Sequence, residues 1–293
     1  MDEPTTKATP LLSTAQMAEF AARGVLRFDA VVADELNGRA IEELRAWGAR
    51  PFSRPTPASL TPLSDCYPEA AIGDVLRLPV VQGIIASLVG PDPVFDHDFV
   101  HLRGPRDEVD QRLHADAIID PTTAFDIQVF YFPHAVAPGE GGTRFVAGTH
   151  LRRVNESDIA RYQNVRGQAD FAGPAGSILV FHHGLWHSGR ANRSDRDRVM
   201  YKIRLNPTVA QVRQWDTSDL DAVQSEPSDH IFARFDPGKV AHVLRRPEPW
   251  WEQASGRLEQ RNRALLWRYL TGDTAFDVDY YLTRTERREA IAP

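Results

Sequence analysis

The chain has 293 residues, and 34 Lys and Arg against 40 Asp and Glu give it a formal net charge of −6. Its 42% hydrophobic content excludes a disordered tail protein. No run approaches the roughly 18 apolar residues of a membrane helix, and the acidic balance gives no general attraction to nucleic acid. The N-terminus lacks the pattern of a secretory signal, and the single cysteine suits a reducing compartment. We therefore expect a cytoplasmic protein with no membrane or nucleic-acid partner.

The first third of the chain is predicted to be mainly helical. Residues 1–12 are expected to form a polar leader, after which Ser13 and Gln16 make a capping box for a helix that ends at Gly24. The expected elements that follow are a strand at 25–28, a helix at 33–47, an irregular proline-rich connection at 49–63 and a helix at 72–89.

The middle of the chain reads as short strands separated by turn residues. Strands at this spacing, without long helices between them, favour an antiparallel sandwich or barrel over a parallel sheet. We expect one domain over residues 1–293: helices and first strands in 1–93, a β core in 94–207 and a helical extension in 208–293. The predicted core strands are 99–102, 124–132, 143–146, 177–181 and 199–205, and the clearest later helix is 257–270.

Within the predicted β core, His114 and Asp116 are two residues apart. On a strand this spacing places both side chains on one face, where they could bind the same ion. A third ligand must come from another strand, and we choose His187, which follows the predicted strand at 177–181. His182 and His183 remain alternatives. Two histidines and one carboxylate match the facial triad of non-haem iron oxygenases, which leaves coordination positions open.

Arg198 lies eleven residues beyond His187, at the start of the next predicted strand. A hairpin returning from His187 would bring its guanidinium back towards the metal. There it could bind a carboxylate through two parallel charge-assisted hydrogen bonds. Arg196, two residues away on the same side of the strand, is its main rival.

The order and spacing of these motifs resemble the phytanoyl-CoA dioxygenase (PhyH-like) family of Fe(II)/2-oxoglutarate-dependent oxygenases. The resemblance covers about residues 12–207. It rests on the triad motif at 114–116, the segments 141–150 and 173–181, and His187 followed by Asn192 and Arg198.

The resemblance implies a mainly β fold with flanking α-helices around a double-stranded β-helix (jelly-roll, cupin-like) core. It implies Fe(II) bound by His114, Asp116 and His187, with Arg198 on the C5 carboxylate of the cosubstrate 2-oxoglutarate. The implied reaction consumes O₂, converts 2-oxoglutarate to succinate and oxidises a small-molecule metabolite or natural-product intermediate, most simply by hydroxylation. Desaturation, cyclisation and epimerisation stay open as alternatives. Because Asp116 is present, we expect oxygenation and not halogenation.

Relatives also place polar side chains on the cosubstrate at the positions of Thr143, Gln111 and Gln128. Some members carry a serine two residues after the distal histidine, whereas this chain has Gly189 there and Ser188 one residue earlier.

Arginines close to the site-bearing segments are either solvated charges or contacts for an anionic substrate; they are Arg103, Arg106, Arg112, Arg144 and Arg190. Trp250, Trp251 and Trp267 are assigned to helix packing in preference to a substrate lid. Two other functional classes stay open: a non-catalytic jelly-roll binding protein, and a zinc-dependent cupin-like hydrolase or isomerase. The sequence does not indicate an oligomeric state.

Overall fold

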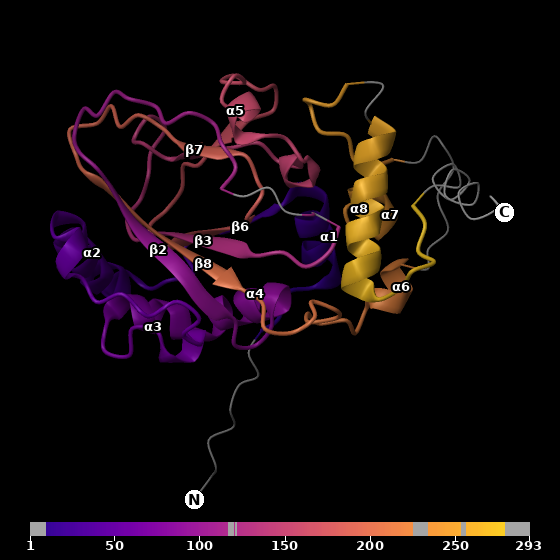
Figure 1. Cartoon of the computed structure of the whole chain (residues 1–293), viewed down its shortest axis with the longest axis horizontal. Coiled ribbons are helices and arrows are strands. Elements are labelled where there is room, and N and C mark those ends of the chain that lie inside the picture. Colours follow the sequence, from indigo (N-terminus) through magenta and orange to yellow (C-terminus); the bar gives the residue numbers. More distant parts are fainter. Residues whose placement is uncertain (1–9, 117–119, 121, 225–233, 253–255, 279–293) are drawn as a thin grey trace, which may run out of the picture.

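The computed structural model describes residues 10–116, 120, 122–224, 234–252 and 256–278. Its centre consists of two antiparallel sheets, with helices packed outside them (Figure 1). Neighbouring strands are mostly distant in sequence, as in a jelly roll, and the sheets do not close into a barrel. The predicted fold class is confirmed. In spatial order the large sheet contains β1 (Val25–Phe28), β6 (Ser177–His182), β3 (Ile127–Phe132), β8 (Arg198–Asn206) and β2 (Val94–Arg103), and the small sheet contains β5 (Ala169–Asp170), β4 (Thr143–Phe145) and β7 (His187–Gly189).

The space between the sheets is filled by aromatic and aliphatic side chains. Because successive side chains of a strand point to opposite faces, alternate residues of β3, β6 and β8 meet here. This cluster includes Phe130, Phe132, Leu179, Phe181 and Met200. The outer face of the large sheet packs against the helices and joins the larger core of the molecule. Both faces of β3 and β6 are therefore buried, which explains their nearly continuous apolar sequences.

The N-terminal elements follow the sequence closely. Helix α1 (Thr14–Arg23) begins with the expected capping box, and Gly24 ends it with φ 69°. Helix α2 (Asp34–Ala49) packs against β2 and β8, at the opposite end of the large sheet from β1 (Figure 1). The proline-rich connection contains only two 3₁₀ turns, η1 (Pro51–Ser53) and η2 (Leu63–Asp65).

The single helix predicted at 72–89 is wrong, because the structure divides it into α3 (Ala71–Arg77) and α4 (Pro79–Val89). Pro79 begins α4, and the residue before a proline is driven out of the helical region. Leu78 accordingly has φ −56° and ψ 133°. In the described part of the chain no single helix is long and apolar enough to span a membrane. The bent pair α3–α4 (65°) meets that length and composition test, but most of its residues are buried in the core.

The C-terminal helices pack beside α1. Helix α8 (Gly256–Thr271) lies against α1 and α7 (Val240–Arg245), with α6 (Leu220–Gln224) next to α7 (Figure 1). Trp267 is fully buried against Trp215 and Phe276, as expected for helix packing. The remaining short helices are η3 (Thr149–Leu151) and α5 (Glu156–Ile159). The domain boundaries at residues 93 and 207 stay a prediction.

Candidate active site

His114, Asp116 and His187 come together at one point, as the sequence analysis expected. His187 begins β7, and its backbone exchanges two hydrogen bonds with His114, at 3.0 and 2.8 Å. The sequence analysis placed His114 and Asp116 on a strand, but in the structure this segment belongs to neither sheet. This isolated antiparallel bridge is what fixes its position relative to β7.

The three side chains form an open donor set. Asp116 Oδ1 lies 3.3 Å from His114 Nε2, and Asp116 Oδ2 lies 3.7 Å from His187 Nε2. Ligands about 2.1 Å from a six-coordinate ion would be roughly 3 Å apart when adjacent, so these separations suit one small cation.

Backbone carbonyls orient both imidazoles. His114 Nδ1 lies 2.8 Å from the carbonyl oxygen of Arg112, and His187 Nδ1 lies 2.9 Å from that of Leu185. A carbonyl can only accept, so each Nδ1 carries a proton, and in the neutral ring each Nε2 presents a lone pair towards Asp116. Lone pairs facing one another are unfavourable without a cation between them. The donor set therefore fits a metal ion.

The electrostatics keep Asp116 and His187 in the protonation states that bind a metal ion. Burial lowers the pKa of His187 to about 4, so its ring is neutral at physiological pH. Burial alone would raise the pKa of Asp116. The hydrogen bond to His114, the neighbouring His187 and the ammonium group of Lys202 outweigh that effect and hold this pKa well below its usual range. Burial lowers the pKa of His114, but its bonds to Asp116 and the Arg112 carbonyl leave it above the usual value, as expected where a proton occupies the cation's place.

His187 is packed from below by two phenylalanines. Its ring centroid lies 5.6 Å from Phe130 and 5.8 Å from Phe181, both in edge-on contacts. Trp186, the residue before His187, faces a separate cluster with Leu113 and Val146. Adjacent residues of an extended chain point to opposite sides, so Trp186 does not pack beneath the His187 ring.

The two alternative histidines lie outside the triad. His182 packs among Phe20, Phe125 and His150, and burial lowers its pKa to about 3. His183 approaches the site only through Gln128, whose Nε2 lies 2.7 Å from His183 Nδ1. Of the remaining histidines, His230 lies outside the described residues.

Arg198 is a buried cation with few partners. Its exposed fraction is 2%; Nε has no hydrogen-bond partner among the described residues, and Nη1 makes one long contact of 3.5 Å to the His101 carbonyl. Burial and the neighbouring Arg103 lower its pKa to about 10, so it stays charged at neutral pH. Its rival Arg196 is 72% exposed and paired with Glu140 at 2.5 Å.

Arg198 does not reach this position through a hairpin. β7 belongs to the small sheet and β8 to the large one, so the connection crosses between sheets. Asn192, which is fully buried, holds that connection by donating to the carbonyls of Gly104 and Arg196 at 3.0 and 2.6 Å.

The other expected cosubstrate contacts have different environments. Thr143 is buried, and its hydroxyl has no partner among the described residues; it pairs across the small sheet with Gly189. Ser188 points away and accepts a hydrogen bond from Arg144. The side-chain oxygen of Gln111 accepts from the Gly189 amide at 3.0 Å.

Two polar residues near the triad were missed. Lys202 Nζ lies 2.9 Å from Asp116 Oδ2, and His101 has a buried Nε2 without a described partner. Burial lowers the pKa of His101 to about 3, helped by Arg198 and Lys202. Counting alternate residues of β8 from Arg198 would have indicated Lys202, since 198, 200, 202 and 204 share a face.

The arginines considered for an anionic substrate are mostly paired with carboxylates. Arg103 binds Asp107 at 3.0 Å, Arg106 binds Asp195 at 2.7 Å and Arg190 binds Asp110 at 2.8 Å. Arg144 is buried and donates to Ser188 and to backbone carbonyls, while Arg112 is exposed.

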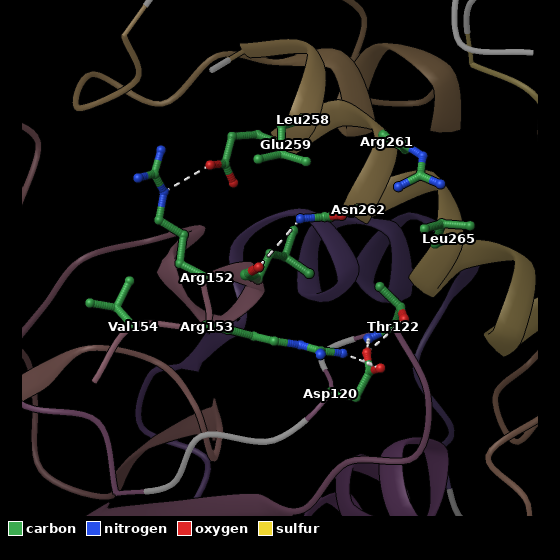
Figure 2. Close-up of a pocket in the computed structure, with 11 residues that line it drawn as sticks. Asp120, Thr122, Arg152, Arg153, Val154, Leu258, Glu259, Arg261, Asn262 and Leu265 are labelled. Carbon is green, nitrogen blue, oxygen red and sulfur yellow. Dashed lines mark hydrogen bonds and ion pairs between the residues drawn. The ribbon is translucent and has the colours of Figure 1, made fainter. Parts of the chain in front are cut away.

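A cavity of about 500 Å³ lies between the segment 151–154 and α8 (Figure 2). Figure 2 shows two ion pairs among its lining residues, Arg152 with Glu259 and Arg153 with Asp120. None of its lining residues belongs to the triad. This cavity is therefore not the metal centre.

Comparison with known proteins identifies the family to which the chain belongs. Residues 39–200, more than half of the chain, match the family model described as phytanoyl-CoA dioxygenase (PhyH). No curated protein matches. Among solved structures, EctD from S. alaskensis in its apo form aligns with TM-score 0.52 and 14% identity, covering 70% of this chain and 80% of EctD.

Two further structures share the fold. HygX from Streptomyces hygroscopicus, with nickel and 2-oxoglutarate bound, aligns with TM-score 0.53 and 16% identity over 70% of this chain and 90% of HygX. SnoK, a non-haem α-ketoglutarate-dependent carbocyclase from nogalamycin biosynthesis, aligns with TM-score 0.51 and 18% identity over 76% of this chain and 94% of SnoK. The family match, on a jelly roll that carries a His-Asp-His triad, shows that the chain belongs to the phytanoyl-CoA dioxygenase family and is a dioxygenase-type oxidoreductase.

Proposed function

We propose that this protein is an Fe(II)/2-oxoglutarate-dependent dioxygenase that oxidises, most simply hydroxylates, a small-molecule metabolite or natural-product intermediate. His114, Asp116 and His187 hold the iron through one atom each, which leaves positions for the cosubstrate and O₂. The bound iron supplies the activation of O₂ that is coupled to decarboxylation of 2-oxoglutarate to succinate.

The observation that carries this proposal is the state of Arg198. A buried guanidinium without a carboxylate partner is costly, and it is retained where an anion completes its environment. Arg198 and Lys202 lie on the same face of β8, and Lys202 Nζ is 2.9 Å from Asp116 Oδ2, so the guanidinium lies on the side of the sheet that carries the triad. We assign Arg198 to the C5 carboxylate of 2-oxoglutarate.

Thr143 supplies the second contact in this proposal. Its unpartnered hydroxyl lies opposite Gly189, where relatives carry a serine. A hydroxyl on the neighbouring strand replaces the missing one. Gln128 and Gln111 hydrogen-bond to Asp116 and to the Gly189 amide, so the cosubstrate assignment is argued from Arg198 and Thr143.

The same observation separates this function from its rivals. A zinc hydrolase on this scaffold has no use for a buried, unpaired Arg198, and a pure binding protein needs no open triad. HygX was solved with 2-oxoglutarate bound and EctD with 2-oxoglutarate and 5-hydroxyectoine, which supports a small-molecule substrate here.

The test is anaerobic addition of Fe(II) and then 2-oxoglutarate, followed by visible absorption spectroscopy. A metal-to-ligand charge-transfer band is expected in the parent protein and is expected to vanish in Asp116→Ala and His187→Ala. His182→Ala is the matched control, because His182 lies outside the triad and should keep the band. Absence of the band from iron-loaded parent protein, or O₂-independent activity with Zn(II) alone, would overturn the proposal.

A further inference from the structure

Two side chains outside the triad converge on one oxygen of Asp116. Lys202 Nζ donates to Asp116 Oδ2 at 2.9 Å, and Gln128 Nε2 donates to the same oxygen. We propose that Lys202 and Gln128 are positioning residues that occupy Oδ2, so that Asp116 presents Oδ1 to the metal. The inference rests on the proposed function, because it concerns the same triad.

The count of acceptor sites supports this division of the carboxylate. Each carboxylate oxygen has about two lone-pair positions. Gln128 and Lys202 fill those of Oδ2, whereas Oδ1 has one contact, to His114 Nε2 at 3.3 Å. Oδ1 is therefore the oxygen with acceptor capacity left for a metal ion, on the side of His114.

Gln128 is itself held in one orientation. The residue is fully buried, and its Nε2 also lies 2.7 Å from Nδ1 of His183, which is 1% exposed. Burial lowers the pKa of His183 to about 3, so this ring is neutral and its Nδ1 accepts. The amide therefore directs its nitrogen at both partners, since a carbonyl oxygen there would repel the Asp116 carboxylate.

Lys202 contributes charge from the neighbouring strand. It lies on β8 on the same face as Arg198, and its side chain is only 12% exposed. A charge-assisted hydrogen bond in such a buried position is stronger than one in water, because the local dielectric constant is lower. Together, the ammonium group of Lys202 and the buried amide of Gln128 hold Oδ2 in place and so limit rotation of the Asp116 carboxylate about χ2.

The first test measures metal binding without turnover. Titration of the apo protein with Co(II), followed by calorimetry and by the Co(II) absorption spectrum, is expected to show binding about 10- to 100-fold weaker in Lys202→Met and Gln128→Leu. Arg204→Met is the matched control, because Arg204 shares the strand face of Lys202 but pairs with Asp126 and Asp96. Its Co(II) affinity and spectrum should equal those of the parent.

The second test replaces the carboxylate by formate. In Asp116→Gly, added formate is expected to bind between Lys202 and Gln128 and to restore Co(II) affinity and the parent spectrum. In Asp116→Gly combined with Lys202→Met, this rescue should be lost. If Lys202→Met does not fold, as judged by circular dichroism, Lys202→Gln replaces it, and a several-fold loss of affinity is expected.

Parent-like Co(II) affinity in the Lys202 variants, or formate rescue that does not need Lys202, would overturn the positioning role. Its failure is distinguishable from that of the proposed function. A Lys202-dependent Co(II) site in a protein that forms no charge-transfer complex with Fe(II) and 2-oxoglutarate would sustain the positioning role and refute the dioxygenase assignment.

Discussion

Arg198 is a buried charge with one long hydrogen bond among the described residues, and this determines what its removal does. Arg198→Met is expected to raise KM for 2-oxoglutarate about 100-fold, the loss of roughly 3 kcal/mol of charge-assisted hydrogen bonding. Because no carboxylate loses its partner, the melting temperature of the apo variant should not fall. Steady-state kinetics and thermal melts check both statements.

Arg196→Met is the matched control for that experiment. Arg196 is two residues away, but it is exposed and paired with Glu140. Its removal should leave KM for 2-oxoglutarate unchanged. An equal effect of the two substitutions would contradict the assignment of Arg198.

Cys66 shows how burial controls reactivity at a single residue. Its side chain is inaccessible, and burial raises the pKa of the thiol to about 11. Since the thiolate is the reactive form, we expect negligible modification by a disulfide reagent at pH 8 in the native protein and stoichiometric modification in urea. Fast reaction of the folded protein would contradict the packing around η2.

At the scale of elements, the end of α1 depends on a close approach. Gly24 has φ 69°, and a Cβ atom there would lie 2.5 Å from Nδ1 of the His150 ring. Gly24→Ala is therefore expected to lower the free energy of unfolding by about 1–3 kcal/mol, from backbone strain and from the clash. Urea denaturation measures this change.

Gly38 provides the opposite case. It lies within α2, and a Cβ atom would meet nothing within 4 Å. Gly38→Ala is expected to raise the free energy of unfolding by about 0.5–1 kcal/mol, because alanine loses less conformational freedom in a helix. A destabilising effect at this position would be inconsistent with the exposed face of α2.

For the whole molecule, buried neutral histidines predict sensitivity to mild acid. Burial lowers the pKa of His101, His182 and His183 to about 3, against 6.5 when unfolded. Their contribution to stability is complete above pH 6.5 and is lost progressively as the pH falls from 6.5 towards 3, because only the unfolded state binds the protons. At pH 5.5 each of these three histidines is expected to lower the free energy of unfolding by about 1 kcal/mol.

Urea denaturation of the metal-free protein at pH 7.5 and 5.5 measures this loss. His182→Asn is expected to reduce the difference between the two pH values, since it removes one of the titrating groups. A free energy of unfolding that is the same at both pH values would show that these rings are not buried as described.

Much of the local structure follows from nearby residues. The capping box at Ser13, the left-handed Gly24 and the alternating strands depend on neighbours in sequence, so they could be predicted. The helix predicted at 72–89 is an exception with a local cause, since Pro79 divides it into α3 and α4. The residue before a proline is disfavoured in a helix, so the break could also have been predicted from the sequence.

The amino-acid sequence was enough to predict that His114, Asp116 and His187 lie together and that the core is antiparallel, because residue types and their order along the chain are properties of the sequence. The role of Arg198 stays a proposal. Only the tertiary structure decided which face each residue presents. It placed Phe130 and Phe181 beneath His187, turned Ser188 away, and brought Lys202 and Gln128 onto one oxygen of Asp116. These contacts join residues from different strands, and the register between strands is fixed by the packing of the whole core.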